Sequence, residues 1–447
     1  MDLSKDIVVA KFGGTSMADA AAISQSAKVA LQNNVSLVVV SAASGTTNKL
    51  VELTTTDQSQ TNTLIDQIIA NHRQIATELA ASQGILDDLE ALFEELKQAV
   101  GSKDSNDAAG ADSILAFGEL LSSNLMIAAF EQQNVSAELL DVRKVLKTDD
   151  HFGQATPLIR ETKEAATAIK PSLNNGKILV TQGFIGSAPD GATTTLGRGG
   201  SDYSAALLAE AIEADKLQIW TDVAGIASTD PRITADARQI KQLTFQEAAE
   251  LATAGARVLY PRTITPLRRS KIPLFVGNTF EPEQGGTTIV DTTDDQPRVR
   301  AIALKTNQSI LKLTTPEMAH QFGYLAKVFD IFAQFKVSID QISTSEISIA
   351  VVLDDQTLLN QDLINSLEDM GEVSIEGDLS IISLIGNKIN DSPGLIQDIF
   401  GNLESDNAKI SVKMICQGAS QHNLCFLVSD EYGQDTVKRL HQNFIET

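Results

Sequence analysis

Apolar runs alternate with longer segments of helical spacing up to about residue 290. The runs are short, rich in Val, Ile and Leu, and apolar at consecutive positions, as is typical of strands buried on both faces. They lie at 7–14, 36–45, 177–186, 217–226 and 272–278. Segments with helical spacing lie at roughly 17–32, 114–133 and 245–263. The pattern predicts an α/β fold in which a mainly parallel sheet is sandwiched by helices.

A polar stretch with a proline, DTTDDQPRVR (291–300), predicts a domain boundary. Beyond it, the patterns follow the order strand–helix–strand–strand–helix–strand, and this order repeats once. VFDIF (328–332) and IQDIF (396–400) each precede a β-branched run, which supports an internal duplication. We therefore expect two α+β modules of βαββαβ type, with interleaving of the two left open. The expected domains are a catalytic domain over 1–292 and modules over 300–383 and 384–447.

The stretch GATTTLGRGGSDY (191–203) stands out from the rest of the chain. Three threonines lead into a glycine-rich turn that carries Arg198, and a helix-like segment begins near Ser201 or Asp202. Unshielded backbone N–H groups and a helix N-terminus favour an anion. The stretch fits neither of the two standard glycine-rich nucleotide loops. Taken alone, it is equally consistent with a tight strand-to-helix connection.

Polar residues also stand where predicted strands end. Lys11 precedes a Gly-Gly turn, and Thr47 follows the second strand. The strand within 217–226 ends in Thr221-Asp222, and Arg232 lies near that strand end. Because ligands of open parallel sheets bind beyond the carboxyl ends of the strands, we expect these residues to converge on one site with Arg198, Asp202 and Glu119. Each has an ordinary structural explanation when taken alone, and for Glu119 a helix-dipole interaction is the better one. The co-occurrence favours a site.

Composition restricts the partners. The 447 residues carry 35 Lys and Arg against 58 Asp and Glu, a formal net charge of −23, which argues against nucleic acid. Cys416 and Cys425 lie on probable neighbouring strands and read as buried thiols, and the five histidines are scattered. No apolar run is long enough to span a bilayer and no secretory signal is apparent. We expect a cytoplasmic protein that binds neither nucleic acid nor membrane.

A mixed-charge site without a catalytic Ser, Cys or His set suits phosphoryl transfer, where catalysis is mostly positioning and charge neutralisation. Lys11 can reach phosphate oxygens as a point charge. A carboxylate acceptor, with a pKa of about 3.9 for a free Asp side chain, is ionised at neutral pH and needs no general base. Two anions must still be brought together, which calls for Lys11, a glycine-turn anion hole and Mg²⁺.

Several of these stretches resemble those of aspartate kinases, members of the amino-acid kinase superfamily. KFGGTS (11–16) and TTTLGRGGSDYSAALLAEA (193–211) are the most specific of them. The resemblance also covers VSAASGTTN (40–48), FGELLS (117–122), QGFIG (182–186), WTDVAGI (220–226), TDPR (229–232) and EAAELATAGARVLYP (247–261). The tail is similar to the tandem ACT modules of that family. The monofunctional, lysine-sensitive class is the most similar, over essentially the whole chain.

The resemblance implies transfer of the ATP γ-phosphoryl group to the β-carboxylate of L-aspartate, which gives 4-phospho-L-aspartate and opens lysine, methionine and threonine biosynthesis. It implies Mg²⁺ held mainly by the nucleotide phosphates, with no dedicated protein ligands. The implied catalytic residues are Lys11 and Asp202, and the implied substrate-binding residues are Ser41, Thr47, Glu119, Arg198 and Ser201. The implied nucleotide-binding residues are Lys11, Phe12, Gly13, Gly14, Thr221, Asp222, Ala227, Arg232, Arg257 and Val258. Many relatives have Tyr at the position of Ala227 and Lys at that of Arg257, so nucleotide affinity is where we expect this chain to differ.

In the first ACT module, the stretches 318–329 and 337–346 resemble those that hold the inhibitor in lysine-sensitive relatives. A turn at Gly323 would offer N–H groups to an α-carboxylate, and Asp340 and Glu346 would offer carboxylates to ammonium groups. Two acidic residues suit L-lysine better than threonine, and two solvated strand-end acids are the less favoured alternative. The implied effector residues are Met318, Gly323, Tyr324, Leu325, Asp340, Ser345 and Glu346.

Two other functions compete with this hypothesis. One is a kinase of the same fold that acts on glutamate or N-acetylglutamate, although Glu119 would then face an amide in the second case. The other is a non-catalytic amino-acid sensor, which the intact Lys11, Arg198 and Asp202 argue against. Since ACT modules usually pair their sheets, we expect a homodimer, with a tetramer as the alternative.

Overall fold

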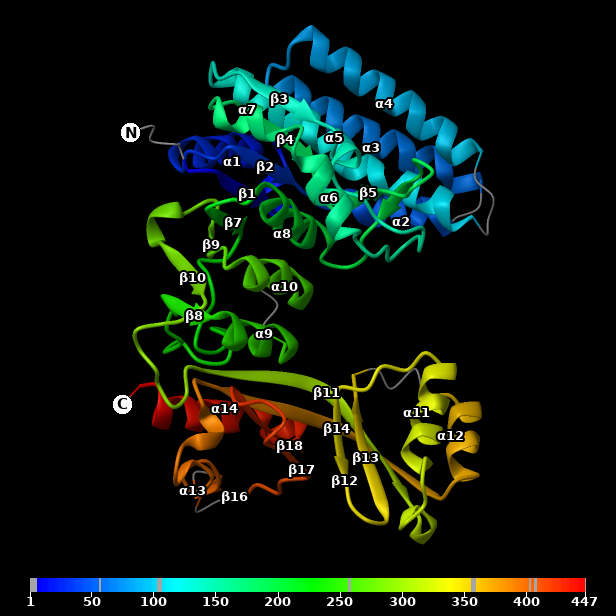
Figure 1. The fold of residues 1–447 in the computed structure, drawn as a ribbon, viewed down its shortest axis with the longest axis vertical. Helices are drawn as coiled ribbons and strands as arrows, with labels where there is room; N and C mark the ends of the chain where they lie inside the picture. Colours follow the sequence, from blue (N-terminus) through cyan, green and yellow to red (C-terminus); the bar gives the residue numbers. More distant parts are fainter. Residues whose placement is uncertain are drawn as a thin grey trace. The chain divides into compact units, whose positions relative to one another are not determined.

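The structure, a computed structural model, describes residues 6–55, 58–102, 107–255, 259–354, 359–401, 403–405 and 408–446. These residues fall into two compact units (Figure 1). The first contains residues 6–226, 239–245 and 259–293, and the second contains 227–238, 246–255 and 294–446. Two short segments from the middle of the chain therefore belong to the unit built mainly by its last third.

The first unit is an α/β fold. Its strands are β1 (Val8–Phe12), β2 (Leu37–Val40), β3 (Ala137–Leu140), β4 (Ile178–Gln182), β5 (Ile185–Ser187), β6 (Thr193–Thr195), β7 (Lys216–Thr221), β8 (Gln242–Thr244), β9 (Leu274–Asn278) and β10 (Gly286–Val290). Its helices are α1 (Ala20–Gln32), α2 (Thr46–Thr55), α3 (Gln58–Glu78), α4 (Gln83–Gly101), α5 (Ala108–Gln132), α6 (Ile159–Ala166), α7 (Lys170–Asn174), α8 (Gly200–Ile212) and α10 (Pro261–Ser270).

Eight strands form one sheet in the order β3-β4-β2-β1-β7-β9-β10-β8, and β5 and β6 form a separate hairpin. All neighbours in the large sheet are parallel except β9 and β10. The carboxyl ends of β2, β1 and β7 lie side by side, because Phe12 is paired with Val40 on one side and with Trp220 on the other. The mainly parallel sheet predicted from the sequence is confirmed.

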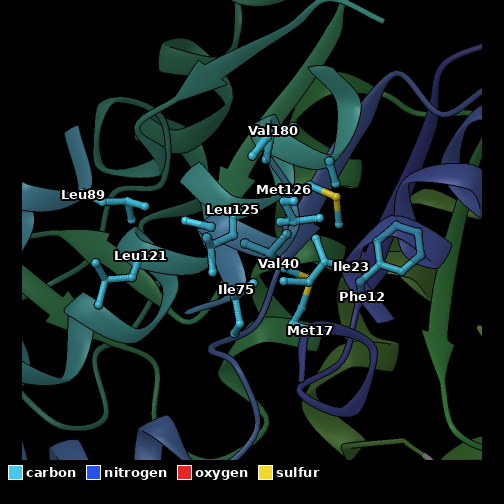
Figure 2. Packing of buried hydrophobic residues seen from close by; sticks show 14 of the residues in the cluster. Phe12, Met17, Ile23, Val40, Ile75, Leu89, Leu121, Leu125, Met126 and Val180 are labelled. Atoms are coloured by element: carbon cyan, nitrogen blue, oxygen red, sulfur yellow. The ribbon is translucent and has the colours of Figure 1, made fainter. Parts of the chain in front are cut away.

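Helices cover both faces of this sheet, as Figure 1 shows. On one face, α1 and α5 pack on the strands, and the core includes the fully buried Phe12, Ile23 and Met126, drawn in Figure 2. On the other face, α8 packs on β1, β2 and β7, with α6 and α10 against α8. Burial on both faces explains why the central strands are apolar at consecutive positions.

Glycines let the loops at the strand ends approach α5 and α8. A Cβ atom on Gly183 would lie 2.7 Å from Cβ of Ser201 and 3.0 Å from the carbonyl oxygen of Val40. A Cβ atom on Gly118 would lie 2.7 Å from Cβ of Ala42. The first contact seats the start of α8 on the strand ends, and the second seats the loop after β2 on α5.

The second unit contains a six-stranded antiparallel sheet in the order β12-β13-β11-β14-β18-β17. Its strands are β11 (Ala301–Thr314), β12 (Gln341–Thr344), β13 (Ser348–Leu353), β14 (Glu372–Ile385), β17 (Met414–Cys416) and β18 (Asn423–Ser429), and β15 (Glu404–Ser405) and β16 (Ala408–Lys409) form a separate pair. Its helices are α11 (Tyr324–Gln334), α12 (Gln361–Glu368), α13 (Leu395–Gly401) and α14 (Asp430–Phe444), together with most of α9 (Phe245–Thr253).

The two predicted modules are interleaved through their long strands. β11 and β14 pair over nearly their whole length, with register shifts between Lys305 and Ile310. One half of this pair packs with α11 and α12 around Leu311 and Val351, and the other half packs with α13 and α14 around Ile382 and Phe426. β11 and β14 therefore each contribute one half of their length to the first module and the other half to the second.

Four predictions about individual elements need correction. The helix predicted from 114 begins at Ala108, so Glu119 lies well beyond its first turn and the dipole explanation for this residue is wrong. The segment 245–263 holds two helices, α9 and the start of α10. The strand predicted near Cys416 spans only three residues. Finally, α5 is by length and composition able to span a membrane, but 78% of its most apolar window is buried inside the fold, as in a core helix.

We predict that Gly183→Ala lowers the free energy of unfolding by about 1–3 kcal/mol, because the added methyl group overlaps Ser201 and must push α8 away. Urea denaturation at neutral pH measures this change. Gly84→Ala is the matched control, since Gly84 lies in α4 with nothing within 4 Å of the added atom and should be neutral or stabilising. Equal stabilities of the two variants would contradict the tight contact.

Candidate active site

A buried ion pair lies where β1 ends and α8 begins. Lys11 is the next-to-last residue of β1, and its Nζ atom lies 2.6 Å from Oδ1 of Asp202 in the first turn of α8. The Lys11 and Asp202 side chains are only 10% and 17% exposed. Because the pair is largely shielded from water, the ammonium group is held in one place at the carboxyl edge of the sheet.

The Gly-Gly turn after β1 leaves room beside this ammonium group. A Cβ atom on Gly13 would lie 3.6 Å from Nζ of Lys11 and 3.9 Å from Oγ1 of Thr221, and one on Gly14 would lie 3.3 Å from the carbonyl oxygen of Ala42. The N–H group of Gly13 donates to the carbonyl oxygen of Trp220 at 3.0 Å. Gly13 therefore fixes the turn to β7 and keeps space open, whereas its own N–H group is already used.

Glu119 on α5 faces the same edge. Its side chain accepts hydrogen bonds from the N–H group of Ala42 and, at 3.4 Å, from the hydroxyl of Ser201. Burial raises the pKa of Glu119 to about 8, against the opposing effects of Ala42, Ser201 and the positive charge of Lys11. The site therefore brings together Lys11, Asp202, Ser201 and Glu119, a carboxyl group that is mostly protonated at neutral pH when the site is empty.

Arg198 lies in the turn between β6 and α8, with Gly197 and Gly199 on either side at positive φ angles of 74° and 71°. Its side chain is exposed, and among the described residues no carboxylate lies within ion-pair distance of it. Asp202 lies four positions further along the chain, so the Cα atoms of the two residues are at most about 15 Å apart. The guanidinium group is thus available to a ligand on the side of the sheet where Lys11 lies.

Two predicted substrate-binding residues follow β2. Ser41 is half-buried, and its N–H group donates to the carbonyl oxygen of Phe12 at 3.1 Å, which ties it to the end of β1. Thr47 is exposed in the first turn of α2. Both hydroxyl groups belong to loops that open from the same edge of the sheet.

The predicted nucleotide-binding residues are divided. Thr221 ends β7 at the site, and its hydroxyl donates to Asp222 at 3.1 Å. The side chain of Phe12 points into the hydrophobic core, so only its backbone can face a ligand (Figure 2). Ala227 and Arg232 belong to the second unit, where Arg232 is paired with Asp230 at 2.6 Å. Arg257 and Val258 lie outside the described residues.

Sequence reasoning missed one buried carboxylate near the glycine turn. Asp112 on α5 is 1% exposed and accepts hydrogen bonds from the N–H groups of Gly153 and Thr195 and from the hydroxyl of Thr195, at 2.7–3.0 Å. It anchors β6, and thereby the turn that carries Arg198, to the helix that carries Glu119. The sequence around Asp112 predicts a polar loop. This carboxylate could have been found only by predicting that α5 begins at Ala108.

In the second unit, a hollow of about 530 Å³ lies between the turn before α11 and the end of β12. It is lined by Met318, Ala319, His320, Gln321, Phe322, Gly323, Tyr324, Leu325, Thr344, Ser345 and Glu346. Gly323 has a φ angle of 77° at the N-cap of α11, so the helix N-terminus opens into this hollow. Six of the seven predicted effector residues therefore line one cavity.

The seventh, Asp340, is not part of that lining. Its carboxylate lies 2.7 Å from Nζ of Lys305 on β11, and the same ammonium group lies 2.7 Å from Asp354. Lys305 thus already neutralises Asp340 in this structure, and Glu346 is the acidic side chain that faces the hollow.

No group of three or more His, Cys, Asp or Glu side chains suited to a metal ion exists among the described residues. Cys416 and Cys425 are free thiols paired directly across β17 and β18, which confirms the neighbouring strands expected from the sequence. Cys425 is buried, whereas Cys416 is only half-buried.

Comparison with known proteins identifies the family. The model of the amino acid kinase family matches residues 6–278. Lysine-sensitive aspartokinase 3 of Escherichia coli (strain K12) is 44% identical over 452 residues, which covers 99% of this chain and all of that one. The chain belongs to the aspartokinases of the amino acid kinase family. An ACT domain model matches residues 382–444.

Other aspartokinases agree with this assignment. Chloroplastic aspartokinase 3 of Arabidopsis thaliana is 35% identical, over 98% of this chain and 82% of that one. The structure of E. coli aspartokinase III in complex with aspartate and ADP, an R-state, superposes with a TM-score of 0.87 at 42% identity, covering 98% and 99% of the two chains. The T-state of the same enzyme, in complex with lysine and aspartate, gives a TM-score of 0.86 at 42% identity, covering 99% and 100%. The amino-acid kinase fold with a C-terminal ACT region is thereby shown for this aspartokinase.

We predict that Glu119→Gln changes how stability depends on pH. The pKa of Glu119 is about 8 in the folded chain, above its ordinary value of 4.5, so the folded state holds a proton that the unfolded state releases. Stability from this group is complete below pH 4.5 and is lost as the pH rises toward 8. The variant, which carries no ionisable group here, should gain stability over the wild type between pH 6 and pH 9.

Urea denaturation at both pH values measures the gain. Glu131→Gln, at an exposed position of the same helix, is the control and should run parallel to the wild type. A wild type that keeps the same stability difference from Glu119→Gln at pH 6 and pH 9 would rule out the raised pKa.

Proposed function

We propose that the chain transfers the γ-phosphoryl group of ATP to the β-carboxylate of L-aspartate, giving ADP and 4-phospho-L-aspartate. The observation that carries the proposal is the arrangement at the sheet edge, where the buried Lys11–Asp202 pair lies beside a glycine turn and a buried glutamate. The E. coli enzyme of the same fold binds aspartate and ADP, which supports both substrates. The product would enter lysine, methionine and threonine biosynthesis.

Lys11 has the central role in the transfer. Two anionic reactants repel each other, and a fixed ammonium group at their meeting point lowers that repulsion most where negative charge develops in the transition state. Asp202 holds Nζ of Lys11 in place at 2.6 Å. Mg²⁺, bound mainly by the phosphates with Asp202 as the nearby carboxylate, would supply further neutralising charge. Gly13 and Gly14 leave the space that the phosphates require.

Aspartate is recognised by charge. Arg198 would hold its α-carboxylate in a bidentate pair, and Glu119 would pair with its ammonium group, with Ser41, Thr47 and Ser201 as hydroxyl partners. Because Glu119 is protonated in the empty site at neutral pH, it must lose its proton to form the ion pair. Aspartate binding would therefore release a proton and strengthen as the pH rises toward 8.

A coupled assay with hydroxylamine, which traps acyl phosphates, tests the proposed reaction on the wild type with a panel of amino acids. Product with aspartate alone supports the proposal. Product with glutamate or N-acetylglutamate would instead support another acid acceptor, and no product with any acid would support a non-catalytic sensor. Lys11→Ala, which removes the fixed ammonium group, should leave no measurable product while circular dichroism remains that of the wild type.

We also propose that L-lysine inhibits this enzyme by binding in the hollow of the first ACT module. The N-terminus of α11 at Gly323 would receive the α-carboxylate, and Glu346 would receive an ammonium group. The relative that binds lysine in its T-state covers this whole region. A ligand that binds one of two conformations better shifts the population toward it, which is how a distant hollow can control catalysis.

The remaining proposals concern assembly and location. We propose a homodimer, with a tetramer as the alternative, because the edge strand β12 carries exposed side chains such as Ile342, at 47% exposure, that another copy could cover. The chain would act in the cytoplasm, where its free thiols Cys416 and Cys425 remain reduced.

Arg198→Ala should raise the KM for aspartate at least tenfold and change the KM for ATP less than twofold, because the guanidinium group pairs only with the acceptor. Arg198→Lys should have a KM for aspartate between those of the wild type and Arg198→Ala, since it keeps the charge and loses the bidentate geometry. Steady-state kinetics with each substrate varied in turn measure both constants. Arg160→Ala, on the exposed face of α6, is the control, and equal changes in both KM values for Arg198→Ala would refute the assignment.

Glu346→Gln should raise the lysine concentration for half-maximal inhibition by about tenfold or more, because an ion pair with the effector is lost. Inhibition curves at fixed aspartate and ATP measure the shift. Glu317→Gln is the matched control, since Glu317 is exposed near the hollow but does not line it. Unaltered inhibition in Glu346→Gln would remove this residue from the effector site.

A further inference from the structure

A buried histidine in the last helix joins the C-terminal end of that helix to a segment from the middle of the chain. His441 on α14 is fully buried, and its Nε2 atom lies 2.8 Å from the hydroxyl of Ser228. Its Nδ1 atom lies 2.7 Å from Oε1 of Glu446. Ser228 belongs to the segment 227–238, which lies between β7 and β8 in the sequence but within the second unit in space.

The direction of these hydrogen bonds follows from their partners. An ionised Glu446 only accepts, so the Nδ1 atom of His441 carries the proton and donates. In neutral imidazole, Nε2 is then the acceptor, and the hydroxyl of Ser228 donates to it. The same hydroxyl oxygen accepts from the N–H group of Arg238 at 2.9 Å. Ser228, His441 and Glu446 thus form one hydrogen-bonded chain.

Ser228 has every polar atom engaged. Its N–H group donates to the carbonyl oxygen of Arg238 at 2.8 Å, and its own carbonyl oxygen accepts from Ile302 at the start of β11 at 2.7 Å. The guanidinium group of Arg238 in turn donates to the carbonyl oxygens of Ile445 and Glu446, at 2.7 and 3.2 Å. Both ends of the segment 228–238 are therefore held by the end of α14 and by β11.

This segment is continuous with the strand that ends at the candidate site. Thr221 ends β7 beside Lys11 and Gly13, and only four residues separate Asp222 from Ala227. The backbone path of 223–226 thus connects a group at the sheet edge to a segment whose position the C-terminal helix determines. The N–H group of Ile226 donates to the hydroxyl of Thr287 at 2.8 Å, so this connection is anchored before Ala227. A loose segment would therefore give more conformations to the residues after Ile226, which include Ala227 and Arg232.

We propose that His441 is a positioning residue for nucleotide binding: through Ser228 it fixes the segment 227–238, and thereby Ala227 and Arg232, two of the residues expected to bind the nucleotide. His441 touches no substrate in this proposal. The inference rests on the proposed function only in that the site at the carboxyl end of β7 binds a nucleotide. It adds that nucleotide binding also depends on His441, near the end of α14.

Two measurements on the full chain without aspartate test the inference. Hydrogen exchange followed by mass spectrometry reports the order of 227–238, and equilibrium binding of ADP reports nucleotide affinity. In His441→Ala, exchange in 227–238 should become at least about tenfold faster and the Kd for ADP should rise about tenfold, because a buried hydroxyl loses its partner. Exchange in β13 and the binding of lysine should stay as in the wild type.

Three further variants complete the design. Ser228→Ala, a milder change that keeps the imidazole, should reproduce both effects, and the double variant should show no further loss, since both single changes break the same link. Glu446→Gln should behave as the wild type, because the amide oxygen still accepts from Nδ1. Gln442→Ala, at an exposed position beside His441, is the control and should change neither quantity.

Unchanged exchange in 227–238, or an unchanged Kd for ADP despite faster exchange, would overturn the inference. Faster exchange throughout 294–446 in both His441→Ala and Ser228→Ala would also overturn it, by showing a general loss of packing. The outcome is separate from the proposed reaction. A wild type that binds ADP but yields no hydroxamate with any acid would refute the kinase activity and leave this inference standing.

Discussion

The site depends on a charge pair that is held almost out of water. Desolvation of an ammonium and a carboxylate is unfavourable, and a pair as shielded as Lys11–Asp202 contributes little net stability compared with apolar residues of the same size. Such a pair persists where the position of a charge matters. Its geometry in turn requires that the end of β1 and the start of α8 approach closely, which Gly183 and the turn at Gly13-Gly14 permit.

Desolvation also acts on Glu119, where it favours the neutral form of the carboxyl group. Lys11 has a carboxylate partner at 2.6 Å, whereas the partners of Glu119 are an N–H group and a hydroxyl at 3.4 Å, so burial dominates and raises its pKa to about 8. Asp202 orients Lys11. Glu119, which is protonated in the empty site at neutral pH, is ready to become charged when a cation enters.

The position of the strand-end residues could be predicted from the sequence, because parallel strands bring their carboxyl ends to one edge whatever the details. Lys11 was predicted in this way and Asp202 from the helix start after the glycine-rich turn, and the structure pairs their side chains. The position of Glu119 within its helix could not be predicted in this way, because the polar residues before it obscure the start of α5 at Ala108. Asp112, on the same misjudged turns, was missed for the same reason. No local sequence pattern indicates that β11 and β14 are shared by both modules. None indicates that 227–238 belongs to the second unit.

The place of 227–238 in the second unit bears on how a regulatory ligand can affect catalysis. β11 and β14 run through both modules, so a ligand that repositions α11 acts on strands that also carry the packing of α14. The end of α14 holds Ser228 and Arg238 through directional hydrogen bonds, which unlike apolar contacts weaken steeply when partners shift by a fraction of an ångström. A two-state change in the hollow near Gly323 therefore has a continuous route within the second unit, through hydrogen-bonded strands and a buried imidazole, to the segment 227–238. The route requires no contact between effector and substrate, only that the two states differ in how well these bonds are made.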